Sequence, residues 1–152
     1  MPKNLDIWNS VKEVPQQAQK PIRAGRLKGM TDISPQWRMF VMTEQFGPVG
    51  FGWKYTIDRQ WSEEGAGGAI CAMTNISLYV KKDGEWSEAI QGTGGSAFVA
   101  LESKGPYTSD EAFKMSLTDA LSVAMKAIGV GANIYSGNQD YSKYSAPKND
   151  HA

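Results

Sequence analysis

The feature that most constrains the fold is a regular alternation with period two over residues 51–61. The residues at one set of alternate positions are Phe51, Trp53, Tyr55, Ile57, Arg59 and Trp61, and the residues between them are small or polar. Successive side chains of an extended strand point to opposite faces, so this pattern predicts a long β-strand with one largely aromatic face. Such a strand needs a sheet, and the next residues supply one.

A second alternating run near residues 69–81 extends the strand into an antiparallel meander. Its apolar set is Ile70, Ala72, Thr74, Ile76, Leu78 and Val80. The pair Asp83-Gly84 follows, and both residues tolerate the positive φ angles of a two-residue hairpin turn. We therefore expect a third strand over residues 85–91, and we read the glycine-rich residues 92–111 as a connection. Glycines before a helix can cradle phosphate, but these lack the spacing of a nucleotide-binding loop.

Residues 107–133 predict the main helix. Thr108 and Glu111 have the spacing of a capping box, and Gly129 and Gly131 suit a helix end. The expected apolar stripe is Phe113, Leu117, Leu121, Ala124 and Ile128. The expected polar surface is Lys114, Ser116, Asp119, Ser122 and Lys126. This polar surface is the leading functional candidate.

A shorter helix is predicted over residues 35–46, opened by Ser34 as a cap and Pro35 in the first turn. We expect Trp37, Phe40, Val41 and Phe46 to pack inward. Arg38 lies among these apolar neighbours, where an unpaired guanidinium would be costly. A side chain that extends its guanidinium to water, a salt bridge with Glu44 and a contact to phosphate are all open readings. The expected architecture is an α+β fold, in which helices flank a three-stranded antiparallel β-meander.

Length and charge limit the function classes. The 152 residues suit one domain over residues 21–135, with a polar N-terminal segment 1–20 and a flexible tail 136–152. The net charge is zero, but residues 1–28 carry six cations against two anions, a surplus of +4. A nucleic-acid site would therefore be a local concentration of Lys and Arg, and a solvated basic arm without a partner is the plain alternative.

The chain offers little for catalysis or metal binding. Cys71 and His151 are each the only residue of their type, so we expect no disulfide, metal site or other cofactor, and no enzymatic activity. Asp119 beside Thr118 could suggest an acid or a metal ligand, but a helix-internal hydrogen bond or a salt bridge between subunits is the simpler reading. No signal peptide or long apolar run is visible, which favours a cytoplasmic protein.

Two stretches resemble the Rad52-type single-strand annealing proteins. PQWRMFVMTEQFGPVGFGW over residues 35–53 is similar to that family's helix, FG turn and GW strand start, and SDEAFKMSLTDALSVAMKAIGVGAN over residues 109–133 is similar to its later helix. Including GRLKGMTDISP, the string looks closest to the phage annealing proteins called Sak3-like. The resemblance covers about residues 23–135.

The resemblance implies a protein that binds single-stranded DNA and pairs complementary strands without ATP, as an oligomeric ring or helix. It implies DNA contacts at Arg38, Lys126 and Lys114. The paired cations of the family pattern are replaced here by Ser122 and Val123, and the cations that could compensate are Lys54, Arg59, Lys81, Lys82 and the N-terminal segment. A phage exonuclease or a host single-strand binding protein would be a partner, in the cytoplasm of a bacterial host.

Alternatives remain at this stage. A passive single-strand cover would use the same cations and aromatic residues without promoting pairing. Trp53 and Tyr55 could stack on bases, although a core position is the simpler reading for Trp53. Since an antiparallel sheet with free edges invites pairing with another chain, we expect self-association.

Overall fold

The computed structural model describes residues 3–135, so the predicted tail 136–152 lies outside the described residues. The chain forms two compact units, each described by itself: residues 46–127 and residues 1–45 with 128–152. The first unit holds the sheet and the main helix. The fold is mixed α+β with an antiparallel sheet, as the sequence predicts, but the sheet is larger than a three-stranded meander.

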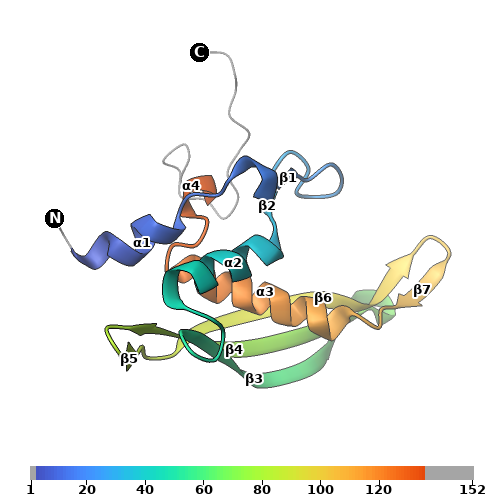
Figure 1. Ribbon diagram of the computed structural model, residues 1–152. Helices are drawn as coiled ribbons and strands as arrows, with labels where there is room; N and C mark the ends of the chain where they lie inside the picture. The colour runs from blue at the N-terminus through green and yellow to red at the C-terminus, as the bar shows by residue number, and fades with distance from the viewer. Residues whose placement is uncertain (1–2, 136–152) are drawn as a thin grey trace, which may run out of the picture. The chain divides into compact units, whose positions relative to one another are not determined.

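The sheet unit is built from five antiparallel strands and one long helix (Figure 1). The strands are β3 (Trp53–Glu64), β4 (Ile70–Lys82), β5 (Glu85–Trp86), β6 (Ile90–Glu102) and β7 (Gly105–Thr108), with the short 3₁₀ helix η3 (Ala66–Gly68) between β3 and β4. Their order is β3-β4-β6-β7, and β5 pairs with β4. Helix α3 (Ala112–Ala127) lies across one face of the sheet.

The contact between α3 and the sheet depends on small residues. A Cβ added to Gly92 or Gly94 would overlap the backbone of α3 at Ala120, and at Gly94 also that of Ser116. Ala120 and Ala124 are fully buried. The glycines therefore allow the helix to lie directly on β6. The prediction that residues 92–111 form a connection is wrong because these glycines serve packing within a strand.

The hairpin turn of the sheet is confirmed. Asp83 and Gly84 have φ angles of 53° and 82°, as a two-residue turn between β4 and β5 requires. The predicted apolar side of β4 is largely confirmed, since Ala72, Thr74, Ile76, Leu78 and Val80 are buried, whereas Ile70 is half-buried. The predicted third strand over residues 85–91 is instead divided between β5 and the start of β6.

A β-bulge changes the faces of β3. Ile57 pairs with Ile76 of β4, and Arg59 pairs with the adjacent Asn75, so Asp58 is the extra residue. An extra residue reverses the alternation beyond it. Arg59 and Trp61 therefore lie on the face opposite Tyr55 and Ile57. The predicted single face over residues 51–61 is correct only from Trp53 to Ile57, because Phe51 lies in the turn before β3 and the bulge follows Ile57.

The main helix begins later than its capping-box pattern suggests. Thr108 is the last residue of β7, and the Ser109 hydroxyl accepts the backbone N–H of Glu111 at 3.3 Å instead. Ser116, which we expected on the polar surface, is fully buried and bonds Thr74 at 2.6 Å between their hydroxyl oxygens. Gly129 and Gly131 do adopt positive φ after the helix, at 103° and 74°.

The second unit joins the two ends of the described chain. Its elements are η1 (Lys3–Leu5), α1 (Asp6–Val11), η2 (Gln16–Ala18), β1 (Gln19–Pro21), β2 (Thr31–Ile33), nearly all of α2 (Pro35–Phe46) and α4 (Ala132–Tyr135). A small core of Val14, Ala18 and Ile33 is covered by Trp37, Ile134 and Tyr135. Backbone N–H groups of Gly131 and Asn133 donate to the carbonyls of Val11 and Lys12, which fixes the N-terminal segment to the end of the unit.

Helix α2 matches its predicted bounds. The Ser34 hydroxyl accepts the N–H of Trp37 at 3.3 Å, as a cap does. Val41 is buried, but Phe40 keeps 59% of its surface exposed, so its predicted inward position is wrong. Periodicity assigned too wide an apolar stripe to this helix.

Candidate nucleic-acid interface

The side of the sheet away from α3 carries three of the seven candidate DNA-binding cations, Lys54, Arg59 and Lys81. We call this side the open face and define it by Lys54, Thr56, Asp58, Arg59, Trp61 and Glu63 of β3, Asn75, Ser77, Tyr79 and Lys81 of β4, and Trp86 of β5. These residues alternate with those that pack under the helix, such as Thr74 and Leu78. Lys54, Arg59 and Lys81 are exposed.

Two lysines and two aromatic rings come together at one end of the open face. The Lys54 ammonium lies 4.2 Å from the centre of the Trp86 ring and 5.6 Å from that of Tyr79. The Lys81 ammonium lies 5.5 Å from the Trp86 ring centre. Strand pairing creates this arrangement, because Lys54 faces Tyr79 and Lys81 faces Trp86 across neighbouring strands. We call these four residues the lysine–tryptophan cluster.

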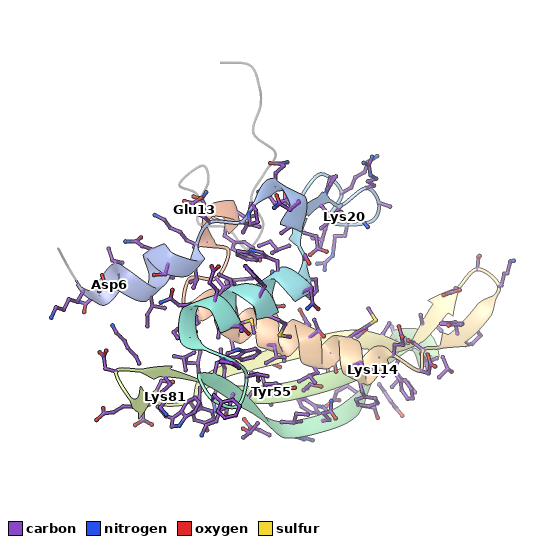
Figure 2. The ribbon with its side chains drawn as sticks, in the orientation of Figure 1. Asp6, Glu13, Lys20, Tyr55, Lys81 and Lys114 are labelled. Atoms are coloured by element: carbon purple, nitrogen blue, oxygen red, sulfur yellow. The ribbon has the colours of Figure 1, made fainter. Side chains whose placement is uncertain are left out.

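The cluster combines two properties that single-stranded nucleic acid requires. Ammonium groups attract phosphates, and exposed aromatic rings stack on bases without reading their sequence. The rings also hold the lysine side chains in place, since a cation over an aromatic face is attracted to it. Figure 2 shows Lys81 at the β5 end of the sheet and Lys114 toward the opposite end of α3.

The other end of the open face has mixed charge. The Arg59 guanidinium lies 4.2 Å from the centre of the Trp61 ring, and the Trp61 indole N–H donates to Glu63 at 2.7 Å. Asp58 accepts hydrogen bonds from the hydroxyls of Ser77 at 2.6 Å and Thr56 at 2.8 Å. The hydroxyl of Ser77, followed by that of Thr56, lowers the pKa of Asp58, so this carboxylate stays ionised at neutral pH.

Arg38, in the other unit, differs from the exposed cations. It is only 6% exposed, and its Nη2 donates to the Tyr135 hydroxyl at 3.1 Å. Its Nε and Nη1 have no hydrogen-bond partner within residues 3–135. Glu44 is exposed on the same helix, and Arg38 bonds Tyr135 rather than Glu44. A guanidinium buried to this extent reaches phosphate only if its surroundings move.

The remaining predicted cations are more scattered. Lys114 is exposed near the start of α3 and Lys126 is half-buried near its end. Twelve residues separate them, which is about 18 Å along a helix and about a third of a turn around it. Lys82 is exposed opposite Glu85 beside the hairpin turn. The helix cations are thus not brought together within this unit, whereas Lys54 and Lys81 are.

The basic N-terminal segment forms an ordered hairpin. Lys20, Arg23, Arg26 and Lys28 are exposed in and between β1 and β2. Backbone bonds from Ile22 to Met30 and from Gly29 to Ile22 close the loop at 2.9 and 2.8 Å. This is a second cationic surface, and it belongs to the unit that also holds Arg38.

Trp53, Thr118 and Asp119, which the sequence singled out, have structural contacts in the sheet unit. Trp53 is 3% exposed, which confirms its core position, and its ring stacks on Tyr55 at 6.4 Å between centroids. The Thr118 hydroxyl donates to the carbonyl of Lys114, a helix-internal bond. The Asp119 carboxylate instead accepts the backbone N–H of Gly95 at 3.0 Å, so it joins α3 to β6.

Sequence reasoning missed Tyr79 and Trp86. Tyr79 lies at an alternate position of the second strand, and the turn over residues 82–85 brings Trp86 back beside Lys81. Both placements could have been read from the predicted hairpin register. The signal was therefore present in the pairing, not in any motif.

Comparisons with known proteins add no relative: no family model matches the chain, and no curated protein matches it either. Within residues 3–135 no helix is long and apolar enough to cross a membrane. The same residues contain no group of three or more His, Cys, Asp or Glu side chains placed to hold a metal ion. The geometry of the lysine–tryptophan cluster is therefore the basis for a functional assignment.

Proposed function

We propose that this protein binds single-stranded DNA and anneals complementary strands without ATP, as a homo-oligomeric ring or filament in phage-type recombination. The lysine–tryptophan cluster is the observation that carries this proposal. Lys54 and Lys81 supply phosphate contacts, and Trp86 and Tyr79 supply stacking surfaces. The chain has no net charge, so its affinity for DNA rests on local clusters of this kind.

The resemblance to Rad52-type annealing proteins supports the same function. The order of a capped helix, an antiparallel sheet and a long helix with a glycine end agrees with what the resemblance implies. We propose Lys54, Arg59 and Lys81 on the open face as DNA-binding cations. Lys82 is a further exposed candidate, and Lys114, Lys126 and Arg38 are the positions that the resemblance implies. Action in the cytoplasm of a bacterial host, alongside an exonuclease or a host single-strand binding protein, follows from the same proposal.

A passive single-strand cover is the second candidate, and the half-buried rings of the cluster favour it specifically. Bases held on Trp86 and Tyr79 would be less able to pair, whereas phosphates held by Lys54 and Lys81 leave base edges free. The two functions therefore differ in which part of the nucleotide the cluster grips.

Mixing two complementary labelled oligonucleotides separates the candidates. An annealing protein increases the rate of duplex formation in the absence of ATP, and a passive cover decreases it. Particle mass measured on the same samples relates the activity to the size of the assembly. A rate equal to that without protein, at concentrations where the strands are bound, would contradict the annealing proposal.

A further inference from the structure

The two edges of the sheet are protected to different degrees. On one side, β7 pairs with the end of β6, from Val99 to Glu102, and Asp119 accepts the N–H of Gly95. On the other side, β3 pairs with β4 and otherwise, among the described residues, only through an isolated bridge from Trp53 to Val49, and eleven of its twelve residues are exposed or half-buried. Unpaired N–H and C=O groups on a long edge strand are a template for another strand.

The charges along β3 are arranged in an unusual order. On the open face the sequence of side chains is Lys54, Thr56, Asp58, Arg59, Trp61, Glu63, with the bulge placing Asp58 and Arg59 next to each other on the same face. If this order is compared with the same order in reverse, each position that carries a positive charge matches one that carries a negative charge, and each negative position matches a positive one. The strand is therefore complementary to an antiparallel copy of itself.

We propose that β3 pairs with β3 of a second copy of this chain, antiparallel and related by a two-fold axis between Asp58 and Arg59. The facing pairs on the open face are Lys54 with Glu63, Thr56 with Trp61, and Asp58 with Arg59, each occurring twice. Opposite charges that face each other across strands stabilise pairing, and like charges oppose it. The partner is a second copy because the charge order of β3 is complementary to that of an antiparallel β3.

The α3 side of the strand agrees with the same register. Tyr55 faces Ser62 and Ile57 faces Gln60, so apolar residues that are 36% and 49% exposed gain neighbours. The bulge lies on the two-fold axis, so both copies reverse their side-chain alternation at the same point. Facing residues of the two strands therefore lie on the same face of the sheet on both sides of the axis. A parallel pairing would instead put like charges together, and an antiparallel shift by two residues would separate Lys54 from Glu63.

This contact would be one interface of the homo-oligomer that the proposed function includes. A two-fold axis perpendicular to the sheet joins the two sheets and keeps both open faces on the same side. The two lysine–tryptophan clusters then lie about 30 Å apart along the strands, from nine residues at about 3.3 Å each. Since a two-fold contact closes on itself, a ring or filament would be assembled from such pairs through another surface.

Charge reversal tests the complementarity. Lys54→Glu and Glu63→Lys should each weaken dimerisation by about tenfold, because each creates two like-charge contacts per dimer. The double variant Lys54→Glu/Glu63→Lys restores the facing pairs and should recover the association seen in sedimentation equilibrium. Lys104→Glu, on the β6–β7 turn, changes net charge as much as Lys54→Glu and should leave the dimer unchanged. Failure of the double variant to recover association overturns the register.

Cysteine cross-linking tests the register directly. Tyr55→Cys/Ser62→Cys, in a Cys71→Ser background that removes the exposed native thiol, should form a covalent dimer on mild oxidation. Within one strand these positions are about 23 Å apart, far beyond disulfide reach, so the bond must join two copies. Each single cysteine variant should stay monomeric in denaturing electrophoresis, since its two copies are equally distant across the axis.

The outcomes distinguish this contact from the proposed function. No covalent dimer from the double variant, or the same yield from a single variant, overturns the β3 contact. Annealing that persists in such a case leaves the proposed function standing with a different assembly. A covalent dimer that binds no single-stranded DNA supports the β3 contact and counts against the proposed function.

Discussion

The two faces of the same sheet have opposite designs. The face under α3 is made of glycines and small or aliphatic residues, and a Cβ added to Gly92 or Gly94 would overlap the backbone of α3. The open face carries lysines, an arginine and three large aromatic rings, Trp61, Tyr79 and Trp86, all of which are half-buried. Covered residues are constrained by packing, whereas the residues of the open face are available for binding.

A substitution on the face under α3 should therefore affect stability, and a substitution on the open face should affect binding. A substitution under α3 has no room to relax, because the neighbouring atoms belong to the backbone. A substitution on the open face meets flexible side chains or solvent.

The largest effect is expected for Gly94→Ala. Its new Cβ would overlap the backbone of α3, so the helix must shift, and we expect a loss of about 3 kcal/mol in the free energy of unfolding. Gly95→Ala is the matched control on the open face, since its Cβ would meet the flexible end of Met73. That control should change stability by less than about 1 kcal/mol in urea unfolding. Equal losses would contradict the contrast between faces.

A smaller effect is expected in the polar bond under the helix. Thr74→Val keeps the shape but removes the hydroxyl that bonds Ser116 and Gln60, and should cost about 1–2 kcal/mol. Ser116→Ala removes the second hydroxyl of this hydrogen bond. In a double-mutant cycle the combined loss should be smaller than the sum, because the second change removes a group already left unpaired. Simple additivity would show that the two hydroxyls are not coupled.

On the open face the expected change is in DNA affinity. Lys81→Ala should weaken single-strand binding about fivefold and lower the slope of log affinity against log salt by about 0.7. Lys104→Ala removes the same charge from the exposed turn between β6 and β7 and should have little effect. Fluorescence anisotropy at several salt concentrations gives both quantities. Identical losses in the two variants would mean that only net charge matters.

The smallest effect is a shift in titration. Ser77→Ala removes the hydrogen bond that contributes most to the low pKa of Asp58, so that pKa should rise, and Thr56→Ala should raise it less. A carboxyl whose pKa is lowered by folding adds stability above its unfolded pKa and loses it as pH falls through the folded value. Carboxyl NMR titration reports the shift. An unchanged pKa in Ser77→Ala would remove this bond as its cause.

Much of the fold could be predicted because local chemistry determines it. The α2 cap at Ser34, the Asp83-Gly84 turn and the buried set of β4 all follow from short-range rules. The bulge at Asp58 and the strand through Gly92 could not be predicted in the same way. A bulge has no sequence signal of its own, and glycines that permit close packing look the same as glycines of a loop.

The candidate site was only partly predictable. The sequence pointed to Lys54 and Lys81 as separate cations, but their common neighbour Trp86 depends on the register of β4 with β5. The polar face of α3 was less well predicted, because Ser116 bonds Thr74 across the helix–sheet contact. Tertiary contacts, not helix periodicity, decide which side of α3 faces the sheet.

The most direct test of the central claim is to map where single-stranded DNA contacts the protein. Ultraviolet cross-linking of an oligothymidine to the full chain, followed by peptide mass spectrometry, reports that site. If the lysine–tryptophan cluster binds DNA, we expect cross-links within residues 79–86, at Tyr79 and Trp86. Cross-links confined to other segments, with residues 79–86 unmodified at saturating DNA, would contradict it.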